Sequence, residues 1–230
     1  MRPQRLFRSI IAIIVLALAA GYSAYQGSQP TQRTRSESPV TRTSSAFDYY
    51  LISLSWSPSY CETNPDDNEQ CGRRGYGFVL HGLWPQYDRG GGPQACASND
   101  RPDRDTISKT LAFMPSRRLI EHEWRAHGSC SGLAADTYFD LADRAFAAVR
   151  IPGVLSSAGG PPPMTADDLR TAFVDANPGM RSDMLAISCH ADTLSEIRIC
   201  VDENLAVRTC GRGVCTQCPR GKALRIPLMR

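Results

Sequence analysis

The sequence predicts an α+β domain in which a central antiparallel sheet is flanked by several helices and stapled by disulfide bonds. Strand-like and helix-like patterns occur in both orders along the chain, without the regular alternation that is typical of a parallel α/β sheet. The 230 residues are 42% hydrophobic and 21% charged, and nine of them are cysteines. This composition is that of a folded globular protein and excludes collagen-like, coiled-coil and largely disordered chains. We expect one domain over residues 46–230.

The domain is expected to begin with two strands. Residues 47–56 are aromatic and β-branched with partial alternation, which indicates a strand that ends before Pro58. Residues 76–83 indicate a second strand. Residues 62–75 and 88–105 are polar or rich in Gly, Asp and Pro, so we expect loops there.

Helices and further strands are expected in the second half. Helical patterns mark residues 117–127, 136–149 and 165–176. The third of these opens on Thr165 with an acidic residue three positions on, much like a capping box. Residues 185–188 and 195–202 indicate strands, and residues 207–210 are a candidate hairpin partner for the second of them.

Charge is distributed unevenly along the chain. The net charge is +3, yet residues 1–45 hold six Arg and one acid, whereas residues 46–203 hold 14 basic and 22 acidic residues. Binding by phosphate neutralisation needs a broad cationic face, so a simple basic nucleic-acid-binding protein is disfavoured. The tail from Asn204 holds five Arg, one Lys and no acid, and is the one stretch expected to add phosphate contacts.

The N-terminal segment, residues 1–25, is expected to be a signal peptide or an N-terminal membrane anchor. Three Arg precede an apolar run over residues 10–20, which is the layout of a secretory signal. The run is shorter than the roughly 20 residues of a membrane span, although residues 21–25 can extend it. Residues 26–45 are polar and read as a flexible linker. We expect an exported protein, periplasmic or secreted, with any membrane contact made only through residues 1–25.

The cysteines are expected to form disulfides, because export favours disulfides over metal sites. Cys215 and Cys218 form a C-x-x-C pair. No second such pair completes a zinc site, and no strand–helix start supports a thioredoxin-like one. Nine is an odd number, so one thiol is left over or pairs with another molecule.

Three of the four histidines fall in two short segments, residues 81–86 and 121–130. In a helix Glu123 and His127 share a face, whereas His122 and His127 diverge by about 140°. This is not the zinc-protease pattern, so metal ligation is disfavoured. Two imidazoles near a carboxylate suit acid–base catalysis. The alternative, ordinary half-buried histidines, suits a lone His better than this concentration of three.

These two segments resemble the active-site boxes of the ribonuclease T2 family, the exported acid endoribonucleases, in a bacterial-type member. The family's first box reads His-Gly-Leu-Trp-Pro, and residues 81–85 match it fully. Its second box reads His-Glu-aromatic-x-Lys-His-Gly-x-Cys, and the matching residues are His122, Glu123, Trp124, His127, Gly128 and Cys130. Residues 53–61 and 194–200 add support, so the resemblance spans about residues 48–210. One departure is Ala126, where the family usually has Lys.

The resemblance implies a metal-independent endoribonuclease that cleaves single-stranded RNA by transesterification. The 2′-hydroxyl attacks the adjacent phosphorus, which gives a 2′,3′-cyclic phosphate. His127 is then the general base and His81 the general acid, or the two roles are interchanged, while Glu123 stabilises the phosphate and His122 binds it. No metal or cofactor is implied, DNA should resist cleavage, and we expect a monomer. The expected pH profile is bell-shaped, near or below the imidazole pKa of about 6.5.

Substrate-binding residues are predicted beside the two boxes. Trp84 is a candidate base-stacking platform, with core packing as the equal alternative. Gln86 and Tyr87 are candidates for base-edge contacts. Arg125 is expected to contact phosphate and to compensate for Ala126, since losing an oxyanion-type donor costs about 2.7–4 kcal/mol. The residues expected to be structural are Trp56, Trp124 and His190.

The family pattern also implies a set of disulfides. The expected bridges are Cys61–Cys71, Cys96–Cys130 and Cys200–Cys210, together with Cys189 bonded to Cys215 or Cys218. Two other functions remain as alternatives. One is a catalytically weak relative that binds RNA or a protein, which Ala126 favours, and the other is an exported disulfide-rich metalloprotein.

Overall fold

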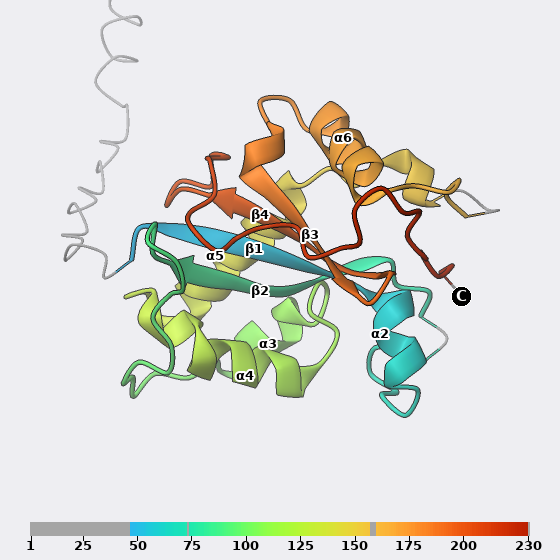
Figure 1. The fold of residues 1–230 in the computed structure, drawn as a ribbon. Coiled ribbons are helices and arrows are strands. Elements are labelled where there is room, and N and C mark those ends of the chain that lie inside the picture. The colour runs from blue at the N-terminus through green and yellow to red at the C-terminus, as the bar shows by residue number, and fades with distance from the viewer. Residues whose placement is uncertain (1–46, 73, 157–159, 230) are drawn as a thin grey trace, which may run out of the picture. The chain divides into compact units, whose positions relative to one another are not determined.

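A four-stranded antiparallel sheet in the order β2-β1-β4-β3 forms the centre of the fold in the computed structural model (Figure 1). The structure describes residues 47–72, 74–156 and 160–229. The expected leader and linker, residues 1–25 and 26–45, lie outside the described residues. The strands are β1 (Tyr49–Trp56), β2 (Phe78–Gln86), β3 (Leu185–His190) and β4 (Thr193–Val201).

Helices surround this sheet, which confirms the predicted α+β class. Figure 1 shows α5 behind the sheet, α4 alongside the edge strand β2, and α6 beyond β3. The helices are α2 (Ser57–Thr63), α3 (Arg104–Thr110), α4 (Arg117–Ala126), α5 (Ala135–Ala148) and α6 (Ala166–Ala176), and the short 3₁₀ turns are η1 (Gly128–Cys130), η2 (Gly153–Ser156) and η3 (Ser182–Met184). Among the described residues, no helix is both long enough and apolar enough to cross a membrane.

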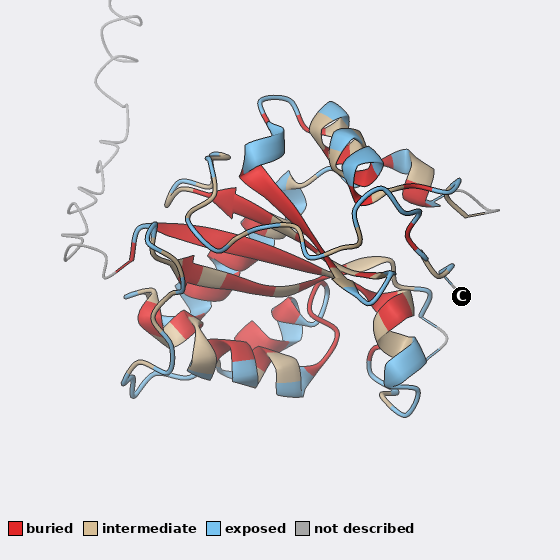
Figure 2. Ribbon diagram, viewed as in Figure 1, coloured by how far each residue is buried: buried red, intermediate tan, exposed pale blue. Residues whose placement is uncertain are grey.

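The two faces of the sheet differ in chemistry. Leu54 of β1 pairs with Ile197 of β4, and both are fully buried in the main core. Successive side chains in a strand point to opposite faces, so the next pair, Ser55 and Glu196, lies on the other face. Figure 2 shows the strands buried over most of their length while the helices expose their outer sides. One face therefore carries the main core. The other, which we call the polar face, has a small buried cluster of Tyr49, Leu51 and Cys200 at one end and polar residues around Ser55 and Glu196.

Strand β2 is longer than predicted and carries one extra residue. Its pairing with β1 steps from Gly82 to Leu80, which leaves His81 without a partner. A bulge of this kind interrupts the alternation of side chains, so consecutive residues His81 and Gly82 both lie on the polar face. The strand continues to Gln86 through Pro85, which an edge strand tolerates because its outer N–H positions are not part of the ladder.

Two short helices, α2 and α3, begin where the sequence predicts a strand end and a loop. Helix α2 begins at Ser57, and Pro58 lies in its first turn, a position that suits proline. The Asp103 side chain accepts a hydrogen bond from the Thr106 amide and caps α3, so the loop predicted over residues 88–105 is two residues too long. The predicted hairpin of residues 207–210 is reduced to a single bridge between Val201 and Val207.

The described residues contain four disulfides. They include the three bridges implied by the family pattern, and the fourth joins Cys189 to Cys218, which leaves Cys215 free and exposed. The bridges are Cys61–Cys71, Cys96–Cys130, Cys189–Cys218 and Cys200–Cys210. Trp56 and Trp124, both 2% exposed, lie in the core as expected.

Candidate active site

The end of helix α4 presents the second histidine-containing segment. The helix stops at Ala126, one residue earlier than predicted, and His127 forms its C-cap while its amide still donates to the Glu123 carbonyl. Gly128 then lets the chain turn against the core, because a Cβ there would lie 2.6 Å from Cε3 of Trp124. His127 is thus held half-buried at a fixed exit from the helix.

Glu123 is the buried carboxyl of the site, with 1% exposure. Its Oε2 accepts a hydrogen bond from Nε1 of Trp84 at 2.7 Å, and its Oε1 lies 3.6 Å from Nε2 of His81. A Cβ at Gly82 would lie 2.1 Å from Oε2, so only glycine permits this approach. Burial raises the pKa of Glu123 to about 7, against the opposing effects of His81 and the Trp84 hydrogen bond.

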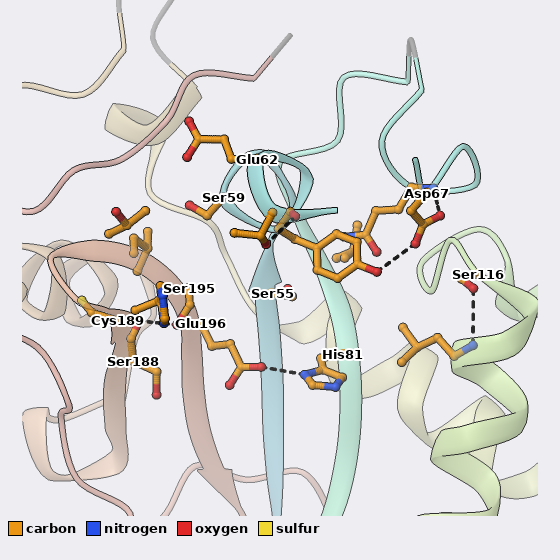
Figure 3. Close-up of a pocket in the computed structure, with 18 of the residues that line it drawn as sticks. Ser55, Ser59, Glu62, Asp67, His81, Ser116, Ser188, Cys189, Ser195 and Glu196 are labelled. Carbon is orange, nitrogen blue, oxygen red and sulfur yellow. Dashed lines mark hydrogen bonds and ion pairs between the residues drawn. The ribbon is translucent and has the colours of Figure 1, made fainter. Parts of the chain in front are cut away.

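His81 has a second carboxylate partner that the sequence reading did not identify. Its Nδ1 lies 2.6 Å from Oε1 of Glu196, and Figure 3 shows the two side chains meeting across the sheet. Burial alone would lower the pKa of His81, but the hydrogen bond and charge of Glu196 outweigh it, so the pKa is raised. Glu196 is fixed in turn by Nε and Nη2 of Arg198 at 2.9 and 2.8 Å.

The Glu196 carboxyl stays ionised in this arrangement. Burial acts to raise its pKa, but the hydrogen bond with His81 and the nearby charges of His81 and Arg198 lower the pKa to about 2. A permanent negative charge therefore lies behind the His81 ring, and Nδ1 donates its proton to that charge. This leaves Nε2 as the ring nitrogen that faces Glu123.

His127 has the opposite electrostatic environment. Its Nδ1 is buried with no hydrogen-bond partner. Burial, followed by the charges of His122 and His81, lowers the pKa of His127 to about 4. One imidazole of the site is thus biased toward the protonated form and the other toward the neutral form.

Trp84 connects the two histidines. Its ring centroid lies 5.1 Å from that of His81 and 5.2 Å from that of His127, and the Arg198 guanidinium lies 5.6 Å from the ring centroid. The ring is partly exposed, so it is not a simple core residue. Its N–H orients Glu123, and its ring also packs against the small buried cluster of Tyr49, Leu51 and Cys200, so Trp84 both packs in the interior and contacts the site.

The remaining predicted site residues divide into two groups. His122 and Arg125 have exposed side chains that line a cavity of about 980 Å³ together with His81. Gln86 instead donates its side-chain amide to the Pro85 carbonyl, and the Tyr87 ring lies under Arg89. No contact in the described part of the chain joins either of these two residues to the histidines.

The cavity lies on the polar face of the sheet and passes beyond the histidines. Glu196 and Arg198 line it, whereas His127 does not, so it opens on the His81 side of the site. Within residues 47–72, 74–156 and 160–229, no three His, Cys, Asp or Glu side chains are grouped so that they could hold a metal ion.

The methyl group of Ala126 offers no hydrogen-bond donor, unlike the Lys that the family usually has at this position. Its backbone carbonyl accepts a hydrogen bond from the Ala95 amide, which joins the loop after β2 to the end of α4. Arg125, the adjacent residue, reaches the cavity that His81 lines. A cation is thus present near the site, although it does not come from position 126.

Two imidazoles arranged around a buried carboxyl make this a site suited to proton transfer. Residues 47–210 match the model of the Ribonuclease T2 family, so the chain belongs to that family. A ribonuclease of Aeromonas hydrophila is 49% identical over 96 residues, which cover 42% of this chain and 43% of the relative. A probable ribonuclease of Haemophilus influenzae is 30% identical over 183 residues, which cover 71% of this chain and 61% of the relative. The chain thus spans less than two thirds of the length of these relatives.

Solved structures share the fold. An RNase-related protein from Calystegia sepium superposes with a TM-score of 0.63 at 25% identity, covering 80% of this chain and 98% of that one. RNase NT, solved in complex with 5′-AMP, superposes with a TM-score of 0.57 at 23% identity and covers 79% of this chain and 98% of that one. The described domain therefore corresponds to nearly the whole of each of these folds.

Proposed function

We propose that the chain is an endoribonuclease that cleaves single-stranded RNA by internal transesterification without a metal or cofactor. The 2′-hydroxyl attacks the adjacent phosphorus, the bond to the 5′-oxygen breaks, and the products are a 2′,3′-cyclic phosphate and a free 5′-hydroxyl. The observation that carries this proposal is the opposite bias of the two histidines. Acid–base catalysis of this reaction needs one protonated and one neutral imidazole at the same pH.

His81 is the general acid in this mechanism. The Glu196 carboxylate holds the ring in its protonated form and takes the hydrogen bond from Nδ1, so Nε2–H is left to protonate the departing 5′-oxygen. A carboxylate behind a histidine fixes both the tautomer and the orientation of the ring. Glu196 is therefore a positioning residue that acts through His81.

His127 is the general base. Its lowered pKa, about 4, keeps the ring neutral over most of the acidic range. Because Nδ1 is buried, Nε2 is the nitrogen that takes the proton from the 2′-hydroxyl. The family resemblance leaves open which histidine is the acid and which is the base. The surroundings of the two rings support His81 as the acid and His127 as the base.

Glu123 stabilises the phosphate as a neutral acid. Its pKa of about 7 means that it is protonated at acidic pH, when it can donate a hydrogen bond to a phosphate oxygen without repelling it. His122 and Arg125 line the cavity, where they can bind the phosphate. Guanidinium geometry suits this contact, and Arg125 takes over part of the role of the missing Lys.

The cellular compartment and the partner of the protein belong to the same proposal. Four disulfides within the described residues favour an oxidising compartment, so the protein acts after export, in the periplasm or outside the cell. We propose that residues 1–25 direct this export or act as a tether. The partner is single-stranded RNA, because DNA lacks the attacking hydroxyl, and the enzyme works as a monomer.

One incubation series tests this function. The purified protein is mixed with RNA or with DNA, with and without a chelator, from about pH 3 to 9, and products are analysed for cyclic phosphate ends. We expect cleavage of RNA alone, unaffected by chelator, with an acid limb near pH 4 and an alkaline limb above 6.5. The expected active range is therefore wider than the imidazole pKa alone predicts.

Other results of the same series identify the alternatives. RNA binding without cleavage indicates the catalytically weak relative that Ala126 suggests, and loss of activity with chelator indicates a metalloenzyme. His81→Ala and His127→Ala should each abolish cleavage while circular dichroism shows an intact fold. Normal turnover by either variant refutes the assignment.

A further inference from the structure

The cavity extends past His81 into a region that the proposed mechanism does not use. Strand β1 rises about 3.3 Å per residue, so α2, which begins at Ser57, lies about 10 Å beyond the level of His81. Ser59 and Tyr60 of α2 line this part of the cavity, and Ser188 of β3, in register with Glu196, lines its side nearer the level of His81. Figure 3 shows Ser59 and Ser188 around the same hollow as His81. We call the part lined by Ser59, Tyr60 and Ser188 the outer cavity.

Two buried hydroxyls mark the outer cavity as a binding site. Ser59 is 9% exposed and Ser188 is 5% exposed, and the Oγ atoms of both are buried with no hydrogen-bond partner. Buried polar atoms are nearly always paired in folded proteins. Both side chains line the cavity, and each hydroxyl can donate one hydrogen bond and accept others. The outer cavity thus presents unused polar groups to an occupant.

The carboxylates of the cavity lining are already engaged. Glu196 pairs with His81 and Arg198, and Glu62 pairs with Arg225. Asp67 accepts the Tyr60 hydroxyl at 2.9 Å and two backbone amides of its own loop.

The cationic side chains at the rim are exposed. Arg118 and Arg125 project from α4 into the cavity lining. Glu62 and Glu196 are paired with arginines, and the four arginines of the lining outnumber its three carboxylates, so the cavity favours an anionic, hydrogen-bonding ligand.

An aromatic ring completes the outer cavity. Tyr60 is partly exposed, and its hydroxyl is tied to Asp67, which fixes the ring in the lining. Aromatic rings bind bases by stacking with little sequence preference. A nucleotide matches these groups, because its base can stack on the ring, its polar edges can bond the hydroxyls and its phosphate can pair with the arginines.

The direction of the RNA follows from the proposed function, on which this step rests. His81 protonates the oxygen of the departing strand, and the cavity adjoins His81 rather than His127. The cavity therefore receives RNA on the 3′ side of the scissile phosphate. At about 980 Å³ it lies at the upper end of the roughly 300–1,000 Å³ range of ligand pockets. It has room beyond the first departing nucleotide.

We propose that the outer cavity is a subsite for the second nucleotide on the 3′ side of the cleaved bond. The base stacks on Tyr60, and its polar edges or its ribose meet the hydroxyls of Ser59 and Ser188. Arg118 pairs with the phosphate between the two departing nucleotides. The enzyme thus engages three consecutive nucleotides, and oligonucleotides that extend in the 3′ direction are its better substrates.

Oligonucleotides with a 2′-deoxy group at the scissile position test this subsite, because they bind without being cleaved. The affinities of a dinucleotide, of a trinucleotide extended on the 3′ side, and of a trinucleotide extended on the 5′ side are measured by calorimetry. We expect the 3′ extension to tighten binding about tenfold, as one stacked base does, and the 5′ extension to have a much smaller effect. Equal gains from the two extensions, or no gain from either, overturn the subsite.

Three variants assign the gain to the outer cavity. Tyr60→Ala should remove most of the tenfold gain and Ser188→Ala part of it, while dinucleotide affinity stays unchanged. Tyr60→Phe is the matched control and should keep the gain, because it keeps the ring. If Tyr60→Ala does not fold, Ser188→Ala decides the result. A full gain in Ser188→Ala and Tyr60→Ala refutes the proposal.

Cleavage of the all-ribose dinucleotide separates the two proposals. Cleavage without a gain from the 3′ extension leaves the proposed function standing and removes the subsite. A gain in affinity without any cleavage keeps the subsite and removes the proposed function.

Discussion

At the scale of single residues, the site depends on the contrast between two carboxyls on either side of His81. Glu196 is ionised because it is hydrogen-bonded to a cation, whereas burial raises the pKa of Glu123 to about 7 and keeps it protonated in the acidic range. Carboxyls with such different pKa values serve different roles, one as a fixed charge and one as a donor. The function of each residue is thus set by its environment and not by its type.

Removing the Glu196 charge should change the pH profile of the enzyme. In Glu196→Gln the pKa of His81 falls, because the negative charge that raises it is gone. We expect the alkaline limb of kcat/KM to move to lower pH while the acid limb near pH 4, set by His127, stays in place. Activity above neutral pH therefore drops more than activity at pH 5. The measurement is kcat/KM on a dinucleotide substrate across the pH range.

The control for this variant is Glu69→Gln, which neutralises an exposed carboxylate in the loop after α2. It should leave both limbs unchanged. A uniform loss at every pH in Glu196→Gln, with unmoved limbs, indicates a purely structural role for Glu196 and contradicts its role in positioning His81.

The partner of His81 could not be predicted from the sequence, although the two boxes could. The boxes are contiguous and their residue types suit acid–base chemistry, so His81, Glu123 and His127 stand out directly. The contact between His81 and Glu196 joins residues 115 positions apart. The alternation of β4 places Glu196 on the polar face, but the sheet order that brings β4 near β2 is a property of the tertiary fold.

At the scale of elements, the bulge in β2 and the early end of α4 position the site. The bulge turns two consecutive residues to one face, and the helix ends one residue before His127. Main strands and helices were predictable because their apolar periodicity reflects burial. The bulge was not, because it depends on pairing with β1. The helix α2 was missed because Pro58 signals both a strand end and a helix start.

The turn between β3 and β4 contains a residue whose backbone conformation lowers the stability of the fold. Ala191 lies in the turn with φ of 53°, a left-handed conformation that a side chain disfavours. Ala191→Gly should raise the free energy of unfolding by about 0.5–1 kcal/mol, the steric relief less the greater freedom of glycine in the unfolded chain. Urea unfolding without reductant measures this change. Ala147→Gly, in the exposed part of α5, should instead lower it by about 1 kcal/mol; a fall in both variants contradicts the assigned strain.

At the scale of the whole molecule, disulfides join segments that are distant in sequence. The bridge Cys96–Cys130 links the long loop after β2 to the turn that follows His127, across 34 residues. The bridge Cys189–Cys218 ties the C-terminal segment to β3 beside the cavity. His127, at the end of α4, is thus held from both sides, by the helix and by the covalent link that follows it.

Loss of Cys96–Cys130 should affect both stability and turnover. In the double variant Cys96→Ser with Cys130→Ser, the unfolding free energy should fall by about 3–4 kcal/mol, since the unfolded chain regains the freedom of a 34-residue loop. Turnover should fall about tenfold or more, because small displacements of a catalytic group are costly. Cys215→Ser, at the free exposed cysteine, is the control and should leave both quantities unchanged. Unaltered turnover in the folded double variant means that the bridge does not position His127.

The same bridge links the proposed activity to the redox state of the compartment. Thiols stay reduced in the cytosol, so a newly made chain there lacks the link that holds the segment after His127. For an enzyme that cleaves RNA as proposed, this makes oxidation the last step of maturation. The reduced chain inside the cell is then a weaker ribonuclease than the oxidised chain after export.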